Sequence, residues 1–100
     1  MAVVLRFAPR GMTAEMYDEV NKRLDQAGAK NPPGRLYHVC FGEKDNLRIS
    51  DIWDSRESFE KFGKTVWPIL DDIGIQRVEP EFFEVHNMIA GERASSTERS

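Results

Sequence analysis

The sequence predicts an α+β fold of the ferredoxin-like type, in which a four-stranded antiparallel sheet carries two helices on one face. Three observations lead to this fold. Short β-rich runs and amphipathic stretches follow one another in the order β-α-β-β-α-β. A compact turn at Glu43 to Asn46 joins the two central β-rich runs as a hairpin. Right-handed crossovers then place both helices on the same face of the sheet, and another small α+β sandwich is the alternative.

The first strand is predicted over Ala2 to Phe7, and Pro9-Arg10-Gly11 ends it. Thr13 is a typical helix N-cap, and Gly28 is a typical C-terminal stop because glycine accepts the left-handed conformation. Between these two residues, apolar side chains recur at steps of three and four, as expected for the buried stripe of a helix. The stripe consists of Met16, Tyr17, Val20, Leu24 and Ala27.

Two further strands are predicted over Arg35 to Phe41 and Leu47 to Trp53. Ser55 is expected to cap the second helix. Pro68 lacks a backbone N–H, so this helix is expected to break near Trp67 and a short new helix to begin at the proline.

Pro80 precedes the last predicted strand, which runs from Glu81 to Ile89. Residues 1–89 are therefore expected to form one domain, as the length of 100 residues also suggests. Residues 90–100 are small or charged and lack an apolar period, so they are predicted to form a disordered tail.

Composition narrows the range of partners. The net charge is −3 and no basic block occurs, which argues against a nucleic-acid partner. No apolar stretch approaches the ~20 residues that span a bilayer, and the first residues are too short an apolar run for a signal peptide, so we expect a cytoplasmic protein without a membrane partner. Cys40 is the single cysteine, which excludes an internal disulfide.

Strand residues alternate between two faces, and one alternating set is almost purely apolar. We assign this set to the helix-covered face: Val3, Leu5, Phe7, Tyr37, Val39, Phe41, Ile52, Phe83 and Val85. The other set mixes large apolar groups with titratable ones, and we expect it to lie on the face that the helices leave open: Val4, Arg6, Leu36, His38, Cys40, Ile49, Asp51, Trp53, Phe82, Glu84, His86 and Met88.

The hairpin register decides where Asp51 lies. Pairing Gly42 with Leu47 sets His38 opposite Asp51, whereas a slip of one residue would send Asp51 to the other face. We prefer the first register because it keeps an unpaired carboxylate out of the helix-packed core. The same register sets Leu36 opposite Trp53.

A large apolar patch on an open sheet face usually marks an interface. We therefore predict a homodimer that packs sheet against sheet, with a cavity between the sheets lined by Arg6, His38, Asp51, Trp53, Glu84 and His86. His38 and Asp51 are the candidate catalytic pair, with the carboxylate orienting the ring; the alternative is a hydrogen-bonded interface histidine. Arg6 would either bind an anionic group or pair with Glu84. Trp53 would stack on an aromatic ligand or pack in the dimer core.

The junction Asp51-Ile52-Trp53-Asp54-Ser55-Arg56-Glu57-Ser58-Phe59 resembles the strand-to-helix junction of the dimeric α/β-barrel proteins, above all the antibiotic-biosynthesis-monooxygenase (ABM) group and its bacterial relatives. The resemblance covers Ala2 to about Ile89. It implies a homodimeric barrel with a pocket between sheet and helices, and Trp53 and the Ser55 cap are the positions that match the motif. The candidate ligand-binding residues are Arg6, Leu36, Trp53, Phe62, Glu84 and His86.

Members of this family include cofactor-free oxygenases of aromatic polyketides, haem-degrading enzymes, isomerases and cyclases. The haem-degrading members use an Asn on the first strand and a Trp and a His on the second helix, whereas here the first strand has Arg6 and Phe7 and both histidines lie on strands. The resemblance therefore implies a pocket for a small aromatic or polyketide-like compound. Either a monooxygenase or isomerase without cofactor or metal, or a non-catalytic ligand-binding or structural homodimer, would fit.

Overall fold

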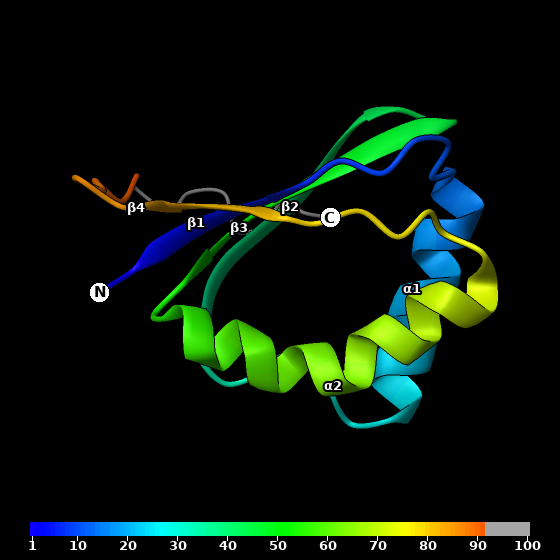
Figure 1. Cartoon of the computed structure of the whole chain (residues 1–100), viewed down its shortest axis with the longest axis horizontal. Coiled ribbons are helices and arrows are strands. Elements are labelled where there is room, and N and C mark those ends of the chain that lie inside the picture. The colour runs from blue at the N-terminus through cyan, green and yellow to red at the C-terminus, as the bar shows by residue number, and fades with distance from the viewer. Residues whose placement is uncertain (92–100) are drawn as a thin grey trace.

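The computed structural model describes residues 1–91, and it has the predicted order of elements. The elements are β1 (Val3–Phe7), α1 (Ala14–Gln26), β2 (Arg35–Glu43), β3 (Asn46–Trp53), α2 (Arg56–Ile73) and β4 (Glu81–Glu84). The strands form one sheet in the order β2-β3-β1-β4, and every neighbouring pair is antiparallel. Both helices cover the same face of this sheet (Figure 1). The α+β, ferredoxin-like prediction is confirmed.

Local sequence signals set the helix ends as predicted. The Thr13 hydroxyl accepts a hydrogen bond from the Met16 N–H at 3.0 Å, and the Ser55 hydroxyl accepts one from the Ser58 N–H at 3.1 Å. Each cap satisfies one of the backbone donors that the first helical turn leaves free. After α1 the chain passes through Gly28 at φ +73°, a conformation that residues with a side chain rarely adopt.

Two predicted boundaries are wrong. The chain does not break at Pro68, because α2 continues through it to Ile73 as one helix. The proline removes a single helical hydrogen bond, and burial of Val66 and Leu70 on either side keeps the two halves in line. The last strand ends at Glu84 instead of Ile89, although the Val85 N–H still donates to the Ala2 carbonyl at 3.0 Å.

Most of the predicted tail, residues 92–100, lies outside the described residues. Ala90 and Gly91 have no regular secondary structure. Neither α1 nor α2 is long and apolar enough to cross a bilayer.

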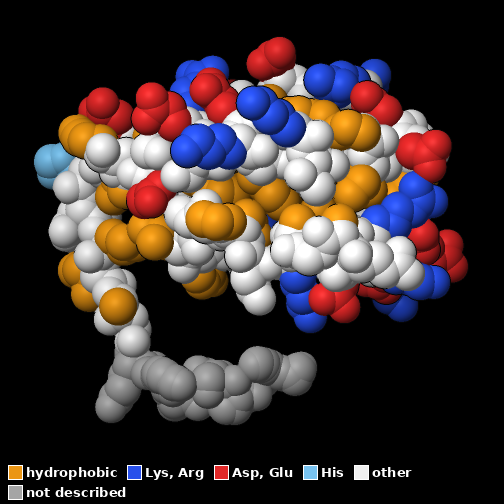
Figure 2. Space-filling model, turned by 90° about the horizontal axis from the view of Figure 1, so that it is seen from below, with side chains coloured by type: hydrophobic (Ala, Val, Ile, Leu, Met, Phe, Trp, Pro, Cys, Tyr) orange, Lys and Arg blue, Asp and Glu red, His pale blue; other side chains and the backbone are white. Residues whose placement is uncertain are grey.

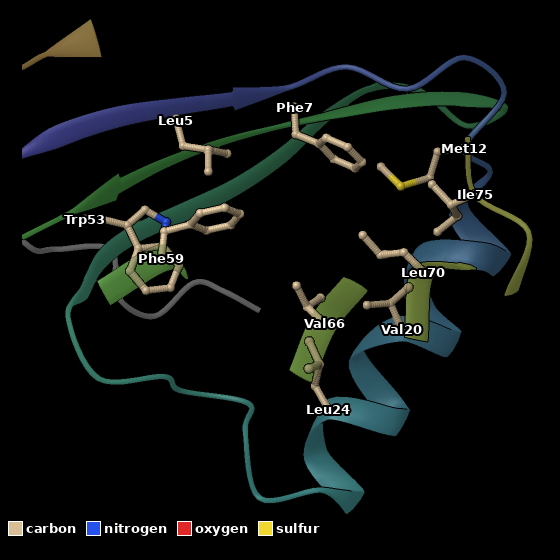
Figure 3. Close-up of a cluster of buried hydrophobic side chains, with 10 residues drawn as sticks. All are labelled: Leu5, Phe7, Met12, Val20, Leu24, Trp53, Phe59, Val66, Leu70 and Ile75. Atoms are coloured by element: carbon tan, nitrogen blue, oxygen red, sulfur yellow. The ribbon is translucent and has the colours of Figure 1, made fainter. Parts of the chain in front are cut away.

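The core lies between the sheet and the two helices. In Figure 3, Leu5 and Phe7 project from β1 toward Val20 of α1 and Leu70 of α2. The same close-up shows Phe59 of α2 beside the indole of Trp53, and their ring centroids lie 5.6 Å apart at an interplanar angle of 75°. Each of these large apolar side chains contributes about 1.5–3 kcal/mol by its burial. This core therefore fixes the distance between the helix layer and the sheet.

The predicted faces are correct for β1 and reversed for the other strands. Leu5, which is 2% exposed and helix-facing, pairs directly with Asp51 of β3 and Phe82 of β4. Residues paired directly across a sheet share a face, so Asp51 and Phe82 face the helices as well. The predicted pairing of His38 with Asp51 is confirmed, and it brings His38 to the same face.

The residues assigned to the helix side on the other strands lie on the open sheet face instead. We use this name for the surface formed by Val4, Arg6, Tyr37, Val39, Phe41, Ile52 and Phe83, which alternate with the helix-facing residues. Tyr37 is 57% exposed and Phe83 is 52% exposed. The opposite side, viewed from below in Figure 2, shows hydrophobic side chains in its middle and charged side chains along its upper edge.

The β2–β3 hairpin is joined to the beginning of α1 by two backbone hydrogen bonds. The Ala14 N–H donates to the Lys44 carbonyl at 2.7 Å, and the Leu47 N–H donates to the Met12 carbonyl at 2.8 Å. Backbone bonds of this kind hold the N-terminal end of α1 against the sheet.

We expect Gly34→Ala to destabilise the protein more than Gly28→Ala. Both glycines have positive φ, +89° and +73°, so each alanine should cost about 1–2 kcal/mol of left-handed strain. A Cβ at Gly34 would also lie within 2.7 Å of side-chain atoms of Ser58 and Asp54, whereas nothing lies within 4 Å at Gly28. Overpacking should add about 1–3 kcal/mol at Gly34 alone.

Urea unfolding of both variants measures this difference. Equal costs at the two positions would contradict the contact between Gly34, which lies just before the strand that carries His38, and Ser58 of α2.

Candidate functional site

A cavity of about 60 Å³ lies between the sheet and the helices. Its walls are mainly apolar side chains of both layers, including core residues labelled in Figure 3. Its polar members are Tyr17, Asn21, Arg35, His38 and Asp51. Polar groups gathered at one part of an apolar cavity are the usual composition of a small-molecule site.

The Asp51 carboxylate is 5% exposed and has hydrogen-bond partners for both oxygens. Oδ1 lies 2.6 Å from His38 Nδ1, and Oδ2 accepts a hydrogen bond from the Trp53 indole N–H at 3.2 Å. A buried carboxylate is costly only when it is unpaired. Asp51 can therefore occupy the helix-packed side, and the reason we gave for keeping it out of the core does not apply.

The partners of His38 define the state of its ring. An ionised carboxylate only accepts hydrogen bonds, so Nδ1 carries the proton that points to Asp51. This leaves the lone pair of Nε2 to accept a hydrogen bond from the Tyr17 hydroxyl, whose oxygen lies 2.6 Å away. The two rings are nearly parallel, with an interplanar angle of 8°. His38 thus has a hydrogen-bonding partner at each ring nitrogen.

Tyr17 completes the chain of hydrogen bonds from α1. Burial raises the pKa of the Tyr17 phenol above its ordinary value of 10.0, while a hydrogen bond with the Asn21 side chain opposes the rise. The hydroxyl therefore keeps its proton at neutral pH and donates a hydrogen bond to His38. We call the bonded series Tyr17–His38–Asp51 the relay. It runs from helix to sheet along one wall of the cavity.

The structure brings together only part of the predicted site. His38 and Asp51 line the cavity with Phe62 of α2, whereas Trp53 is 0% exposed and lies behind Asp51. The cavity lies between the sheet and the helices, as the family resemblance implies, and not between two sheets, where the assignment of faces had put it. Trp53 cannot stack on a ligand in this arrangement, because its ring packs against Phe59 and Phe62.

The other predicted ligand-binding residues lie apart from the cavity. Arg6 is exposed on the open sheet face and pairs across the sheet with Glu81 instead of Glu84. Glu84 is exposed at the end of β4, and His86 is exposed in the bend that follows. Leu36 does not lie opposite Trp53, because a bulge interrupts the pairing there.

Three polar members of the cavity were not among the predicted site residues: Tyr17, Asn21 and Arg35. Tyr17 was placed only as part of an apolar stripe. The sequence feature that could have identified Tyr17 as a site residue is its hydroxyl, because a tyrosine on the buried side of a helix normally needs a polar partner. In the structure that partner is His38.

Cys40 also lies on the helix side, beside the relay on β2. Burial raises the pKa of its thiol to about 11, with the negative charge of Asp18 adding to the rise. At neutral pH the thiolate is therefore scarce, which makes Cys40 a poor nucleophile.

The two histidines lie on different sides of the sheet order. His38 is on β2 at one edge, and His86 follows β4 at the other edge. Within residues 1–91, no three His, Cys, Asp or Glu side chains cluster as a metal site would require.

The fold and the relay define the class: a ferredoxin-like α+β protein with a cavity between sheet and helices, lined by a histidine that is hydrogen-bonded at both ring nitrogens. No family model and no curated protein sequence matches the chain. Several solved structures match the chain.

A putative antibiotic biosynthesis monooxygenase from Chloroflexus aurantiacus aligns with a TM-score of 0.60 and 20% identity, covering 91% of this chain and 100% of that one. SnoaB, a cofactor-independent oxygenase from Streptomyces nogalater, aligns with a TM-score of 0.58 and 20% identity, covering 90% and 96%. A putative antibiotic biosynthesis monooxygenase from Deinococcus radiodurans aligns with a TM-score of 0.58 and 13% identity, covering 92% and 99%. The chain thus has the fold of the ABM-like proteins, as the strand-to-helix junction predicts.

We expect Asp51→Ala to lower the free energy of unfolding by about 3 kcal/mol, because it leaves His38 Nδ1–H and Trp53 Nε1–H without their buried acceptor. Glu84→Ala is the matched control, since this carboxylate is exposed and its loss should change stability by less than about 0.5 kcal/mol. Denaturant unfolding measures both values. A cost below about 1 kcal/mol for Asp51→Ala would contradict the hydrogen bonds described for its carboxylate.

Proposed function

We propose that the protein is a cofactor-independent monooxygenase-like enzyme that acts on a small aromatic compound. The observation that carries this proposal is the relay at the wall of the cavity, which supplies a proton acceptor inside an apolar site. The fold shared with ABM-like proteins, SnoaB among them, supports the same reaction class.

In this proposal the relay removes a proton from the substrate. Tyr17 takes the proton at its hydroxyl oxygen while its own proton moves to His38 Nε2. The Asp51 carboxylate stabilises the imidazolium that forms, because it lies 2.6 Å from Nδ1. Burial of the site strengthens these charge interactions and keeps water from competing.

The reaction balances without an external electron donor. An acidified ring CH₂ loses a proton to the relay, and the resulting carbanion donates electrons to O₂ and forms a C–O bond. The relay returns the proton to the peroxide oxygen. Loss of the second C–H proton with cleavage of the O–O bond then gives a ketone and water, so that R₂CH₂ and O₂ become R₂CO and H₂O.

One observation favours the alternative, a non-catalytic dimer. The cavity of about 60 Å³ is smaller than the ~150 Å³ cavity that holds one benzene ring in an engineered protein. A substrate ring must therefore displace side chains or part of α1 to enter, and a protein that never opens would have a structural role only.

We expect His38→Ala to reduce turnover of an aromatic substrate by about 10²-fold or more, because it removes the proton acceptor. Tyr17→Phe should also reduce turnover, since it removes the group between substrate and His38. His86→Ala is the matched control, because this histidine is exposed and outside the cavity, and it should retain full activity. Oxygen uptake with an aromatic-compound library, in the presence of a chelator, measures the rates.

Oxygen uptake that is equal in the wild type and His38→Ala would rule out the relay as the proton acceptor. If no library compound reacts or binds, the structural role remains.

We also propose that the protein forms a homodimer through the open sheet face. Tyr37 and Phe83 are large, more than half exposed, and lie with Val39, Phe41 and Ile52 on a surface that no helix covers. A second copy packed around a two-fold axis would bury this surface. The interface would then be on the far side of the sheet from the cavity, so each subunit would keep a complete site.

We expect the wild type to sediment at twice the monomer mass at micromolar concentration. Phe83→Glu should shift the equilibrium to monomer, because it places a charge in the apolar interface. Lys61→Glu, an exposed change on α2, should leave the dimer intact. A wild type that sediments as a monomer contradicts the proposed interface but not the relay.

A further inference from the structure

A β-bulge at the beginning of β2 changes which side chain enters the cavity. Regular alternation back from His38 would direct Leu36 toward the helices and Arg35 to the open sheet face. The pairing instead shifts between Arg35 and Tyr37, so that Arg35 lies opposite Trp53 and Leu36 is 55% exposed. The bulge thus exposes a leucine and brings an arginine to the wall of an apolar cavity. Bulges that redirect a side chain are common beside functional sites.

The guanidinium of Arg35 has few partners in this position. One Nη2–H donates to the Lys30 carbonyl at 3.0 Å, and the group lies over the Phe62 ring with its carbon 5.8 Å from the centroid. No carboxylate of residues 1–91 lies within 4.0 Å of it. Arg23, Arg56 and Arg77 all have such a partner. Arg35 therefore keeps N–H donors and a full positive charge for a ligand.

An anionic ligand would give Arg35 the opposite charge that the residues lining the cavity do not supply. The titratable groups that line the cavity are Tyr17, Arg35, His38 and Asp51. Asp51 is already paired with His38, so the positive charge of Arg35 has no counterpart. When the relay takes up a proton, the imidazolium and Asp51 neutralise each other. Arg35 is then the positive charge that remains to stabilise the negative charge on the substrate. A low-dielectric cavity makes this pairing strong.

We propose that Arg35 binds the anionic oxygen of a phenolic or enolic substrate, so that the cavity selects small aromatic compounds with an acidic hydroxyl group. The substrate class follows from the bulge and the unpaired cation, and its use in turnover rests on the proposed function. When the reacting carbon loses its proton, the charge moves by conjugation onto this oxygen, which Arg35 then stabilises as the enolate or phenolate.

Binding of para-nitrophenol tests this site directly, because the phenolate and the phenol absorb differently. The wild type should lower the pKa of the bound phenol. In Arg35→Gln the affinity for the phenolate should fall at least about tenfold, with the pKa returning by about one unit or more, the expected effect of losing a charge-assisted hydrogen bond. Arg35→Lys keeps the charge and should retain part of the shift, which a purely structural role of the guanidinium would not explain.

Arg56→Gln is the matched control. Arg56 also lies over an aromatic ring, Phe82 at 4.1 Å, but it lines a separate hollow of about 250 Å³ outside the cavity. This variant should bind para-nitrophenol as the wild type does. Loss of the shift in Arg56→Gln but not in Arg35→Gln would place the anion in that hollow and overturn the proposal.

An equal shift in the wild type and Arg35→Gln, or the absence of binding by the wild type, would also overturn it. These binding results can be distinguished from a failure of the proposed oxygenase activity, because binding and oxygen uptake are measured separately. A phenolate site that depends on Arg35 with no His38-dependent oxygen uptake would support the anion site and reject the enzyme.

Discussion

The hydrogen bond between Asp51 and His38 joins the features on which the rest of the site depends. It ties the edge strand β2 to β3 through side chains, at the point where the two backbones are also paired. Through His38 it reaches Tyr17 and therefore α1, and through Asp51 it reaches the indole of Trp53. A single carboxylate thus connects three elements and the aromatic part of the core. Buried polar series that are fully satisfied favour one packing arrangement over others, because every alternative leaves a donor or acceptor unpaired.

The burial of this carboxylate also explains why the site has one polar wall and one apolar wall. The residues from α2 that line the cavity are apolar or aromatic, and the indole N–H of Trp67 is their single polar group. None of them is a hydrogen-bond partner of Asp51. All of its partners come from the sheet or lie beside it. A ligand would therefore meet hydrogen-bonding groups on the side of β2 and α1 and a hydrophobic surface on the side of α2. Such a division orients a planar molecule that has one polar edge.

The sequence was sufficient for the order of elements, the caps at Thr13 and Ser55, and the hairpin register that pairs His38 with Asp51, because each depends on local chemistry or on a turn. The sequence was not sufficient to predict which residues of β2, β3 and β4 face the helices. Asp51 was assigned by the cost of an unpaired charge, and the sequence does not show that Trp53 and His38 both supply partners. Pro33 and Gly34 precede the bulge at Leu36, but they indicate the end of a loop and not a change of pairing, so the sequence did not predict the position of Arg35. The predicted helix break at Pro68 was wrong because burial of the neighbouring apolar residues outweighed the strong local preference of proline to end a helix.

The backbone bonds between the β2–β3 hairpin and the beginning of α1 have a mechanical consequence. Met12 and Ala14 are held to the hairpin by backbone hydrogen bonds, whereas the far end of the helix has no backbone bond to the sheet. A tilt of α1 would therefore be centred near its N-terminal end. At the far end, Leu24 is buried in the core, and the exposed pair of Arg23 with Asp72 of α2 adds a weak restraint. The 13 residues of α1 form a lever about 20 Å long, so a tilt of about ten degrees would carry its C-terminal end roughly 3 Å from the sheet. Movement would be smallest near Thr13 and largest near Gln26. The space between α1 and the sheet would therefore widen progressively toward the C-terminal end of the helix.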